Sequence, residues 1–152
     1  MAKITITFPD GSKKEYDQGI TGMDIAKGIS EGLARAAVAI DVDGKAQDLV
    51  LPINLDSKIK IITCKDKEGM EIFRHSSAHL LAHAISELYP YAKMTIGPVV
   101  EEGFYYDIDH TPFTPEDIKK IEQKMHEIMK RKEAITREDI PKKKALELFK
   151  DN

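Results

Sequence analysis

The sequence of 152 residues has a single cysteine, Cys64, and no long hydrophobic run. One cysteine excludes an internal disulfide framework and is typical of proteins from a reducing compartment. No uninterrupted apolar stretch approaches the ~20 residues that a membrane-spanning helix needs. The first ten residues contain no apolar segment of signal-peptide length. We therefore expect a cytoplasmic protein that does not associate with membranes.

The sequence also lacks a large excess of one charge, since its net charge is only −3. From Thr114 onward there are 11 Lys or Arg and 9 Asp or Glu, a surplus of two positive charges. Phosphate binding needs a more concentrated basic surface, so this surplus does not indicate nucleic-acid binding, and no DNA partner is expected. The clusters 130–132 and 142–144 are the better candidates for RNA contact, although such clusters are usually solvated helix faces.

Residues 1–64 have the pattern of a small β-rich domain. Lys3–Phe8 alternates apolar residues with threonine, as in a half-buried strand, and Asp43-Gly44 favours a two-residue hairpin turn. The expected elements are strands at 3–8 and 13–16, a helix capped by Thr21 that ends near Ser30, and strands at 37–42 and 58–62. This order predicts a β-grasp, ubiquitin-like domain of α+β class. The segment contains no histidine, so we expect a binding or spacer module.

Residues 65–70 are charged, include Gly69 and are expected to form a linker. The next segment, 71–88, lacks Gly and Pro, is rich in Leu and Ala, and predicts a helix. Because a helix has 3.6 residues per turn, His75, His79 and His83 share one side of it. Imidazole is the side chain most easily poised between base and acid near neutral pH, so this ridge is where chemistry is expected.

The apolar residues of this helix lie nearly opposite the three histidines and predict its buried face. They are Phe73, Leu80, Leu81, Ala84, Ile85 and Leu88. This arrangement argues against histidines enclosed in a core. Two alternatives stay open: a polar helix face in water, and a helix face that lines a cleft.

Beyond Pro90 the sequence predicts a second α+β segment. The expected elements are strands at 93–96 and 103–108, a helix from the N-cap Thr114 to about Lys132, a third strand candidate at 134–136, and a helix opened by Pro141. The last helix runs to the end of the chain without a closing glycine or a following strand. We therefore expect residues 71–152 to be the N-terminal part of an incomplete domain.

Two kinds of chemistry are open to the histidine ridge. Histidines four residues apart on a helix can hold one metal ion, but Ser76 occupies the position of the catalytic glutamate of zinc proteases. Only His110, His126 or a carboxylate is left as a third ligand, so no metal site is expected within the chain. The alternative is an imidazole that acts as general base on water. Tyr105 and Tyr106 are candidates to hold the substrate, and alternation along a strand predicts that one of them is instead packing.

Three motifs in this order are familiar: His-Ser-Ser-Ala-His-Leu-Leu-Ala-His-Ala-Ile at 75–85, Lys-Met-Thr-Ile-Gly-Pro-Val at 93–99 and Gly-Phe-Tyr-Tyr-Asp-Ile at 103–108. They closely resemble the N-terminal region of the threonyl-tRNA synthetase family. Residues 1–64 look like its TGS domain, with Pro-Asp-Gly-Ser at 9–12 and Met-Asp-Ile-Ala at 23–26. The resemblance spans the whole chain.

The resemblance implies a role in proofreading during tRNA aminoacylation. The family's editing domain hydrolyses tRNA(Thr) that carries serine, and His75 and His79 match its catalytic His-x-x-x-His pair. Tyr106 matches a tyrosine that lines the substrate pocket. The second half of that pocket, with a Cys and a His, and the aminoacylation core both lie beyond residue 152 in the family. We therefore expect the chain alone to have little or no activity, and no cofactor. ATP, Mg and zinc are implied only for the core.

The implied partner is tRNA(Thr), especially its aminoacylated 3′ end, and the full-length enzyme is expected to be a homodimer. Two other functions stay open. The ubiquitin-like unit can be a non-catalytic module that binds RNA or a protein partner, with a structural histidine helix. The chain can also be an independent metallohydrolase, which metal analysis of the purified protein tests.

Overall fold

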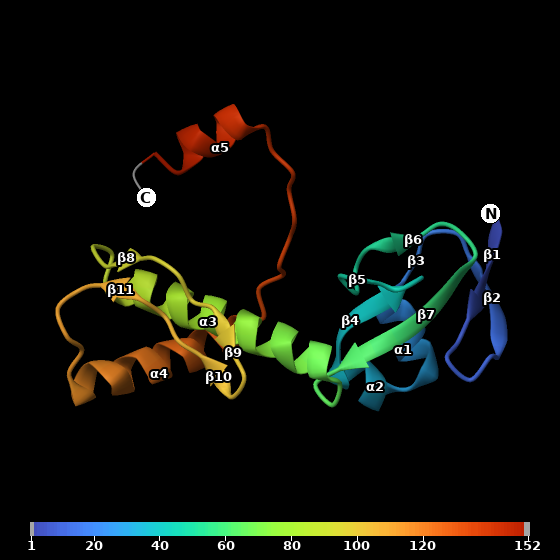
Figure 1. Ribbon diagram of the computed structural model, residues 1–152, viewed down its shortest axis with the longest axis horizontal. Helices are drawn as coiled ribbons and strands as arrows, with labels where there is room; N and C mark the ends of the chain where they lie inside the picture. Colours follow the sequence, from blue (N-terminus) through green and yellow to red (C-terminus); the bar gives the residue numbers. More distant parts are fainter. Residues whose placement is uncertain (1, 151–152) are drawn as a thin grey trace. The chain divides into compact units, whose positions relative to one another are not determined.

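The computed structural model describes residues 2–150 and divides the chain into two units, Met1–Arg74 and His75–Asn152. The division falls inside one helix, α3 (Lys67–Leu88), which Figure 1 shows in green. Within residues 2–150, no helix is long and apolar enough to cross a membrane.

The first unit is a five-stranded mixed sheet in the order β2-β1-β7-β4-β5. The two central neighbours β1 and β7 run parallel, and the other pairs are antiparallel. The strands are β1 (Lys3–Thr7), β2 (Lys13–Asp17), β4 (Ala37–Val42), β5 (Lys45–Gln47) and β7 (Ser57–Thr63). Helix α1 (Gly22–Ile29) covers one face (Figure 1). This is the β-grasp architecture, which confirms the predicted fold class.

Local sequence signals explain most of this unit. Ile4 and Ile6 are buried as the alternation predicts, and Ile25 of α1 is buried in the same core. Thr21 caps α1 in a reciprocal capping box with Asp24. Asp43 and Gly44 both have positive φ, +54° and +84°, as a type I′ hairpin turn requires.

Some short elements of this unit are absent from the sequence-based expectation. Helix α2 (Glu31–Ala36) begins at the N-cap Ser30, whose side chain accepts from the backbone N–H of Leu33. Two-residue strands, β3 (Ile20–Thr21) and β6 (Pro52–Ile53), pair with each other. Such short elements carry too little periodicity to be recognised in a sequence.

Residues 65–70 do not form the expected linker as a whole, because residues 67–70 are already the first turn of α3. Gly69 is buried in that turn, and a Cβ atom at its position would lie 2.0 Å from the carbonyl oxygen of Thr63. The glycine therefore allows helix α3 to start against the end of β7. Its role is close approach of two backbones, not a break between elements.

The second unit packs α3 against α4 (Pro115–Arg131), with a ribbon of short strand pairs beside them (Figure 1). Ala84, Ile85, Ile121 and Ile128 form the buried core between the helices. The predicted apolar stripe of α3 is buried at 84 and 85 and half-buried at 80, 81 and 88, whereas Phe73 is half exposed. Helix α4 starts at the predicted N-cap Thr114, which forms a capping box with Asp117.

The two strands expected at 93–96 and 103–108 form one irregular antiparallel ribbon. At the open end of this ribbon β8 (Lys93–Met94) pairs with β11 (Ile108–Asp109). Next to its turn β9 (Val99–Val100) pairs with β10 (Gly103–Phe104). Between them the register shifts by one residue, because Thr95 and Ile96 both bond to Asp107. Pro98 follows this shift and has no N–H to donate.

The C-terminal part of the second unit has less regular structure than the sequence suggested. The strand candidate at 134–136 is not formed, and Ile135 is 94% exposed. A single strand leaves its backbone groups unpaired unless a neighbouring strand accepts them. Helix α5 (Lys142–Leu148) follows Pro141, as predicted, and none of its residues is buried.

Candidate functional site

His75 and His79 lie next to each other on the exposed side of α3. Their Nε2 atoms are 3.0 Å apart, and the rings meet edge to face with centroids 4.6 Å apart and an interplanar angle of 88°. At this distance the Nε2–H of one ring can donate to the Nε2 lone pair of the other, and the tautomers decide which ring donates. The predicted i, i+4 spacing therefore brings the two rings into direct contact. Both rings stay accessible to solvent.

His83, the third member of the ridge, does not join this pair. Its Nε2 atom lies 3.1 Å from the Oε1 atom of Glu87 on the next turn. Glu87 also accepts two hydrogen bonds from Arg131 of α4, at 2.6 and 2.8 Å, and lies 3.6 Å from the amine of Lys124. The hydrogen bonds from Arg131 and the nearby positive charge hold the pKa of Glu87 at about 2. His83 therefore belongs to the contact between α3 and α4.

Tyr106 lines a hollow of about 380 Å³ between α3, α4 and the ribbon. The hollow is mainly apolar, and Glu122 is its only charged lining residue. Tyr105 also lines it, but the two tyrosines differ in exposure, since Tyr105 is 50% exposed and Tyr106 is half-buried. The alternation of exposure predicted for a strand continues from Phe104 to Ile108, although the ladder is interrupted at residues 105–107. Neither His75 nor His79 is among the lining residues of this hollow.

The structure therefore groups the predicted site residues in two places. The paired imidazoles lie on the exposed side of α3, and Tyr106 lies at the apolar hollow. Among residues 2–150, no group of three or more His, Cys, Asp or Glu is placed to hold a metal ion.

An aromatic cluster at the start of α4 contains His110, one of the candidate third ligands. Its ring stacks on Phe113, with centroids 4.7 Å apart and an interplanar angle of 10°, and Tyr89 packs against both rings. The Nδ1–H of His110 donates to the carbonyl of Thr111 at 2.6 Å. Tyr89 donates its hydroxyl to Asp117 at 2.8 Å. Sequence patterns did not reveal this cluster, because its members come from three separate segments.

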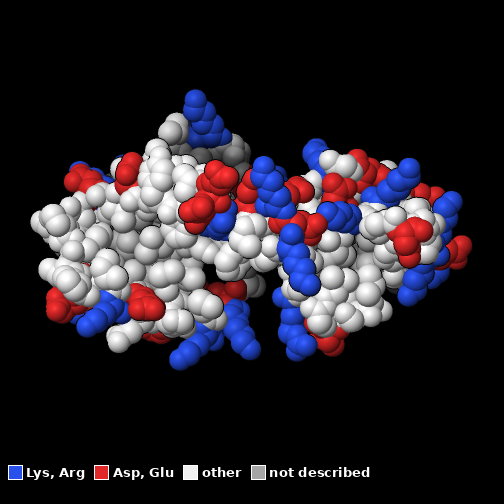
Figure 2. Space-filling view, turned by 60° about the horizontal axis from the view of Figure 1, so that its bottom comes forward, with Lys and Arg blue, Asp and Glu red and all other residues white. Residues whose placement is uncertain are grey.

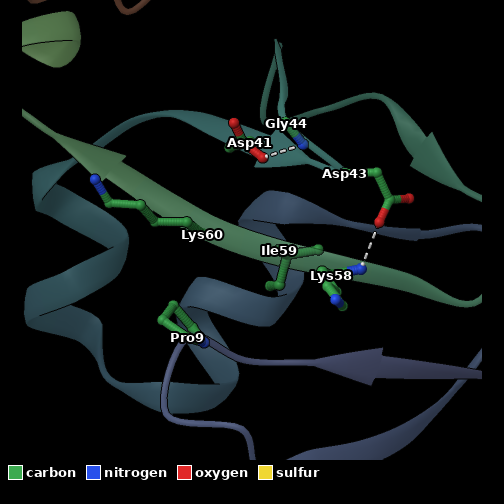
Figure 3. Close-up of a pocket in the computed structure, with 7 residues that line it drawn as sticks. All are labelled: Pro9, Asp41, Asp43, Gly44, Lys58, Ile59 and Lys60. Carbon is green, nitrogen blue, oxygen red and sulfur yellow. Dashed lines mark hydrogen bonds between the residues drawn. The ribbon is translucent and has the colours of Figure 1, made fainter.

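The β-grasp unit carries a second, shallow hollow of about 450 Å³ on its sheet (Figure 3). Its lining residues are Pro9, Asp41, Asp43, Gly44, Lys58, Ile59 and Lys60. Two of its carboxylates are engaged by the backbone, since Asp43 accepts from the N–H of Lys58 and Asp41 from that of Gly44, both at 2.8 Å. Positive and negative side chains lie interspersed on the face of this unit in Figure 2.

Comparison with known proteins agrees with this architecture. Residues 4–63 match the TGS domain family, and this match spans the β-grasp fold of the first unit. Nearly the whole chain is also similar to the N-terminal region of threonine–tRNA ligases. It is 52% identical over 149 residues to the enzyme of Desulfatibacillum aliphaticivorans, 52% over 147 residues to that of Prochlorococcus marinus and 50% over 149 residues to that of Chlorobaculum tepidum.

These matches cover 98%, 96% and 97% of this chain but only 23%, 23% and 22% of the relatives. The chain therefore spans about a quarter of the length of the ligases that it matches. The similarity includes the histidine helix and the ribbon, because the aligned region extends far beyond the TGS domain.

Proposed function

We propose that the chain acts as the N-terminal part of a cytoplasmic threonine–tRNA ligase and contributes to the hydrolysis of tRNA(Thr) that carries serine. The observation that carries this proposal is the contact between His75 and His79, with their Nε2 atoms 3.0 Å apart on an accessible helix face. The similarity to threonine–tRNA ligases over 98% of the chain supports it.

Proofreading is needed because binding alone distinguishes serine from threonine too weakly. Serine lacks one methyl group of threonine, and a methyl group is worth only ~1–3 kcal/mol of discrimination. A second site that is too small for threonine can instead admit the serine ester and hydrolyse it. The substrate of the proposed site is therefore the aminoacylated 3′ end of tRNA(Thr).

Hydrolysis of the ester requires a base for the attacking water and a proton for the ribose oxygen that leaves. When one imidazole of the pair is neutral and the other is protonated, the first has a lone pair for the proton of the water and the second has a proton for the ribose oxygen. In the proposed mechanism His75 and His79 divide these two tasks. Tyr106 lines the pocket that receives the substrate.

The test uses a full-length ligase that contains this N-terminal region. We expect His75→Ala and His79→Ala each to slow hydrolysis of Ser-tRNA(Thr) by roughly 10²–10⁴-fold. Charging of tRNA with threonine should stay unchanged. His83→Ala is the matched control, because His83 contacts Glu87 and not the pair. Unaltered serine release in both variants would contradict the proposed catalytic role.

A second candidate is a non-catalytic module that binds RNA or a partner through the TGS domain. The hollow on its sheet, with Lys58 and Lys60 among its lining residues, favours this function. In that case Lys58→Ala weakens tRNA binding, while the histidine variants leave serine release intact. The two functions therefore give opposite results for the same set of variants.

A further inference from the structure

Gly97 and Tyr106 make an unusually close contact in the second unit. A Cβ atom at Gly97 would lie 2.4 Å from Cδ2, 2.6 Å from Cε2 and 3.0 Å from Cγ of the Tyr106 ring. The ring therefore lies against the bare backbone of the glycine. Gly97 is not among the glycines with positive φ, so it is the space and not the backbone conformation that requires a glycine here.

Backbone hydrogen bonds on both sides keep the two residues opposite each other. On one side Asp107 donates its N–H to the carbonyl of Ile96 at 2.9 Å, and its own carbonyl accepts from the N–H of Thr95 at 3.1 Å. The hydroxyl of Thr95 donates to the same carbonyl at 2.6 Å. On the other side the N–H of Tyr105 donates to the carbonyl of Pro98 at 3.4 Å. The register shifts by one residue where Thr95 and Ile96 both bond to Asp107, and beyond this shift Gly97 lies opposite Tyr106.

We propose that Gly97 is a positioning residue that sets the orientation of the Tyr106 ring and thereby the shape of the apolar hollow. The contact involves one whole edge of the Tyr106 ring, from Cγ through Cδ2 to Cε2. A methyl group at position 97 therefore cannot be accommodated by a small movement of the side-chain end, and the whole ring has to turn. The role of this orientation in serine release rests on the proposed function, whereas the orientation itself does not.

The first test needs no activity and uses the chain of 152 residues. Gly97→Ala and Gly103→Ala are compared by NMR of ring-labelled tyrosine, with Tyr106→Phe to assign the Tyr106 signal. Gly103 lies on the same ribbon, and a Cβ atom there would meet nothing within 4 Å. We expect Gly97→Ala to move the Tyr106 ring signal and its cross-peaks to residue 97, and Gly103→Ala to leave them in place.

The amide of Asp107 reports whether the ribbon survives in the variant. A preserved Asp107 signal together with a displaced Tyr106 signal supports positioning of the ring alone. An unmoved Tyr106 ring in Gly97→Ala overturns the proposal. Loss of both signals means that Gly97 supports the fold of the ribbon in general, and this result also overturns it.

The second test is a double-mutant cycle on serine release by the full-length ligase. A misplacement of about 1 Å can cost up to 10²-fold in rate, so we expect Gly97→Ala to slow the reaction by roughly tenfold or more. In a Tyr106→Ala background the same change should have less than about a twofold effect. Equal effects in both backgrounds contradict action through Tyr106. If the ring moves but serine release does not change, the positioning role stands and the proposed part of Tyr106 in hydrolysis fails.

Discussion

Glu87 of α3 receives both terminal nitrogens of the Arg131 guanidinium from α4, at 2.6 and 2.8 Å. The two residues are 44 positions apart in the chain, so this pair ties distant segments together. Two parallel hydrogen bonds between a guanidinium and a carboxylate are the strongest form of such a contact. Glu127 and Lys124 extend it into a network along α4.

The first prediction concerns the acid stability of this network. The pKa of Glu87 is lowered from 4.5 to about 2 in the folded protein. A lowered pKa means that Glu87 stabilises the fold fully above about pH 4.5, and that this contribution is lost as the pH falls towards 2. We expect Glu87→Gln to reduce amide protection in α3 and α4 at pH 7, and the difference from the wild type to shrink as the pH falls from 4.5 to 2. Hydrogen exchange at a series of pH values measures it.

Arg131→Ala should behave like Glu87→Gln in this experiment, because it removes the other partner of the pair. Arg137→Ala is the control, since Arg137 pairs with Asp139 only two residues away and joins no two elements. Equal losses of protection in Arg131→Ala and Arg137→Ala would show that the network does not connect the helices.

The second prediction compares two helical glycines. Gly69 of α3 approaches the Thr63 carbonyl so closely that a Cβ atom would lie 2.0 Å from it, whereas a Cβ atom on Gly28 of α1 would meet nothing within 4 Å. We expect Gly69→Ala to destabilise the TGS domain by about 3 kcal/mol, at the upper end of overpacking effects. Gly28→Ala should instead stabilise it by about 0.5–1 kcal/mol. Thermal melting of both variants tests this, and the expectation fails if the two shifts have the same sign.

These glycines also show where sequence patterns are informative and where they are not. The capping boxes of Thr21 and Thr114 and the turn at Asp43-Gly44 were predictable, because each depends on a few neighbouring residues. The start of α3 was not, since the role of Gly69 depends on Thr63 of the preceding strand. Gly69 therefore looked like a linker residue in the sequence.

In the candidate site, too, one contact was predictable from the sequence and another was not. The contact of His75 with His79 follows from the helical repeat and was predictable from spacing. The contact of Tyr106 with Gly97 depends on the register between two strands and on the missing N–H of Pro98. The motif resemblance named Tyr106, but no periodicity of the sequence showed which residue lies opposite it or where the hollow opens.

The third prediction concerns the start of α4. The hydroxyl of Thr114 accepts the N–H of Asp117 at 3.2 Å and donates to its carboxylate at 2.7 Å. Loss of an N-cap side chain costs about 1 kcal/mol, so Thr114→Ala should lower the free energy of unfolding of the second unit by about that amount. Thr114→Ser keeps the hydroxyl and should cost less than half as much. Circular dichroism melting curves compare the two, and equal losses would exclude the hydroxyl as the cause.

The fourth prediction separates the core of the second unit from the rim of its hollow. Ile85 is 1% exposed between α3 and α4, whereas Ile118 lines the hollow and is 55% exposed. Truncation of a buried isoleucine costs about 2–5 kcal/mol, and a change at an exposed position usually stays within about 0.5 kcal/mol. We therefore expect Ile85→Ala to unfold the unit at much lower denaturant concentration and Ile118→Ala to leave its stability almost unchanged. A large loss in Ile118→Ala would mean that the hollow is closed in solution by packing around this side chain, and that the unit buries more of α4 than its core residues indicate.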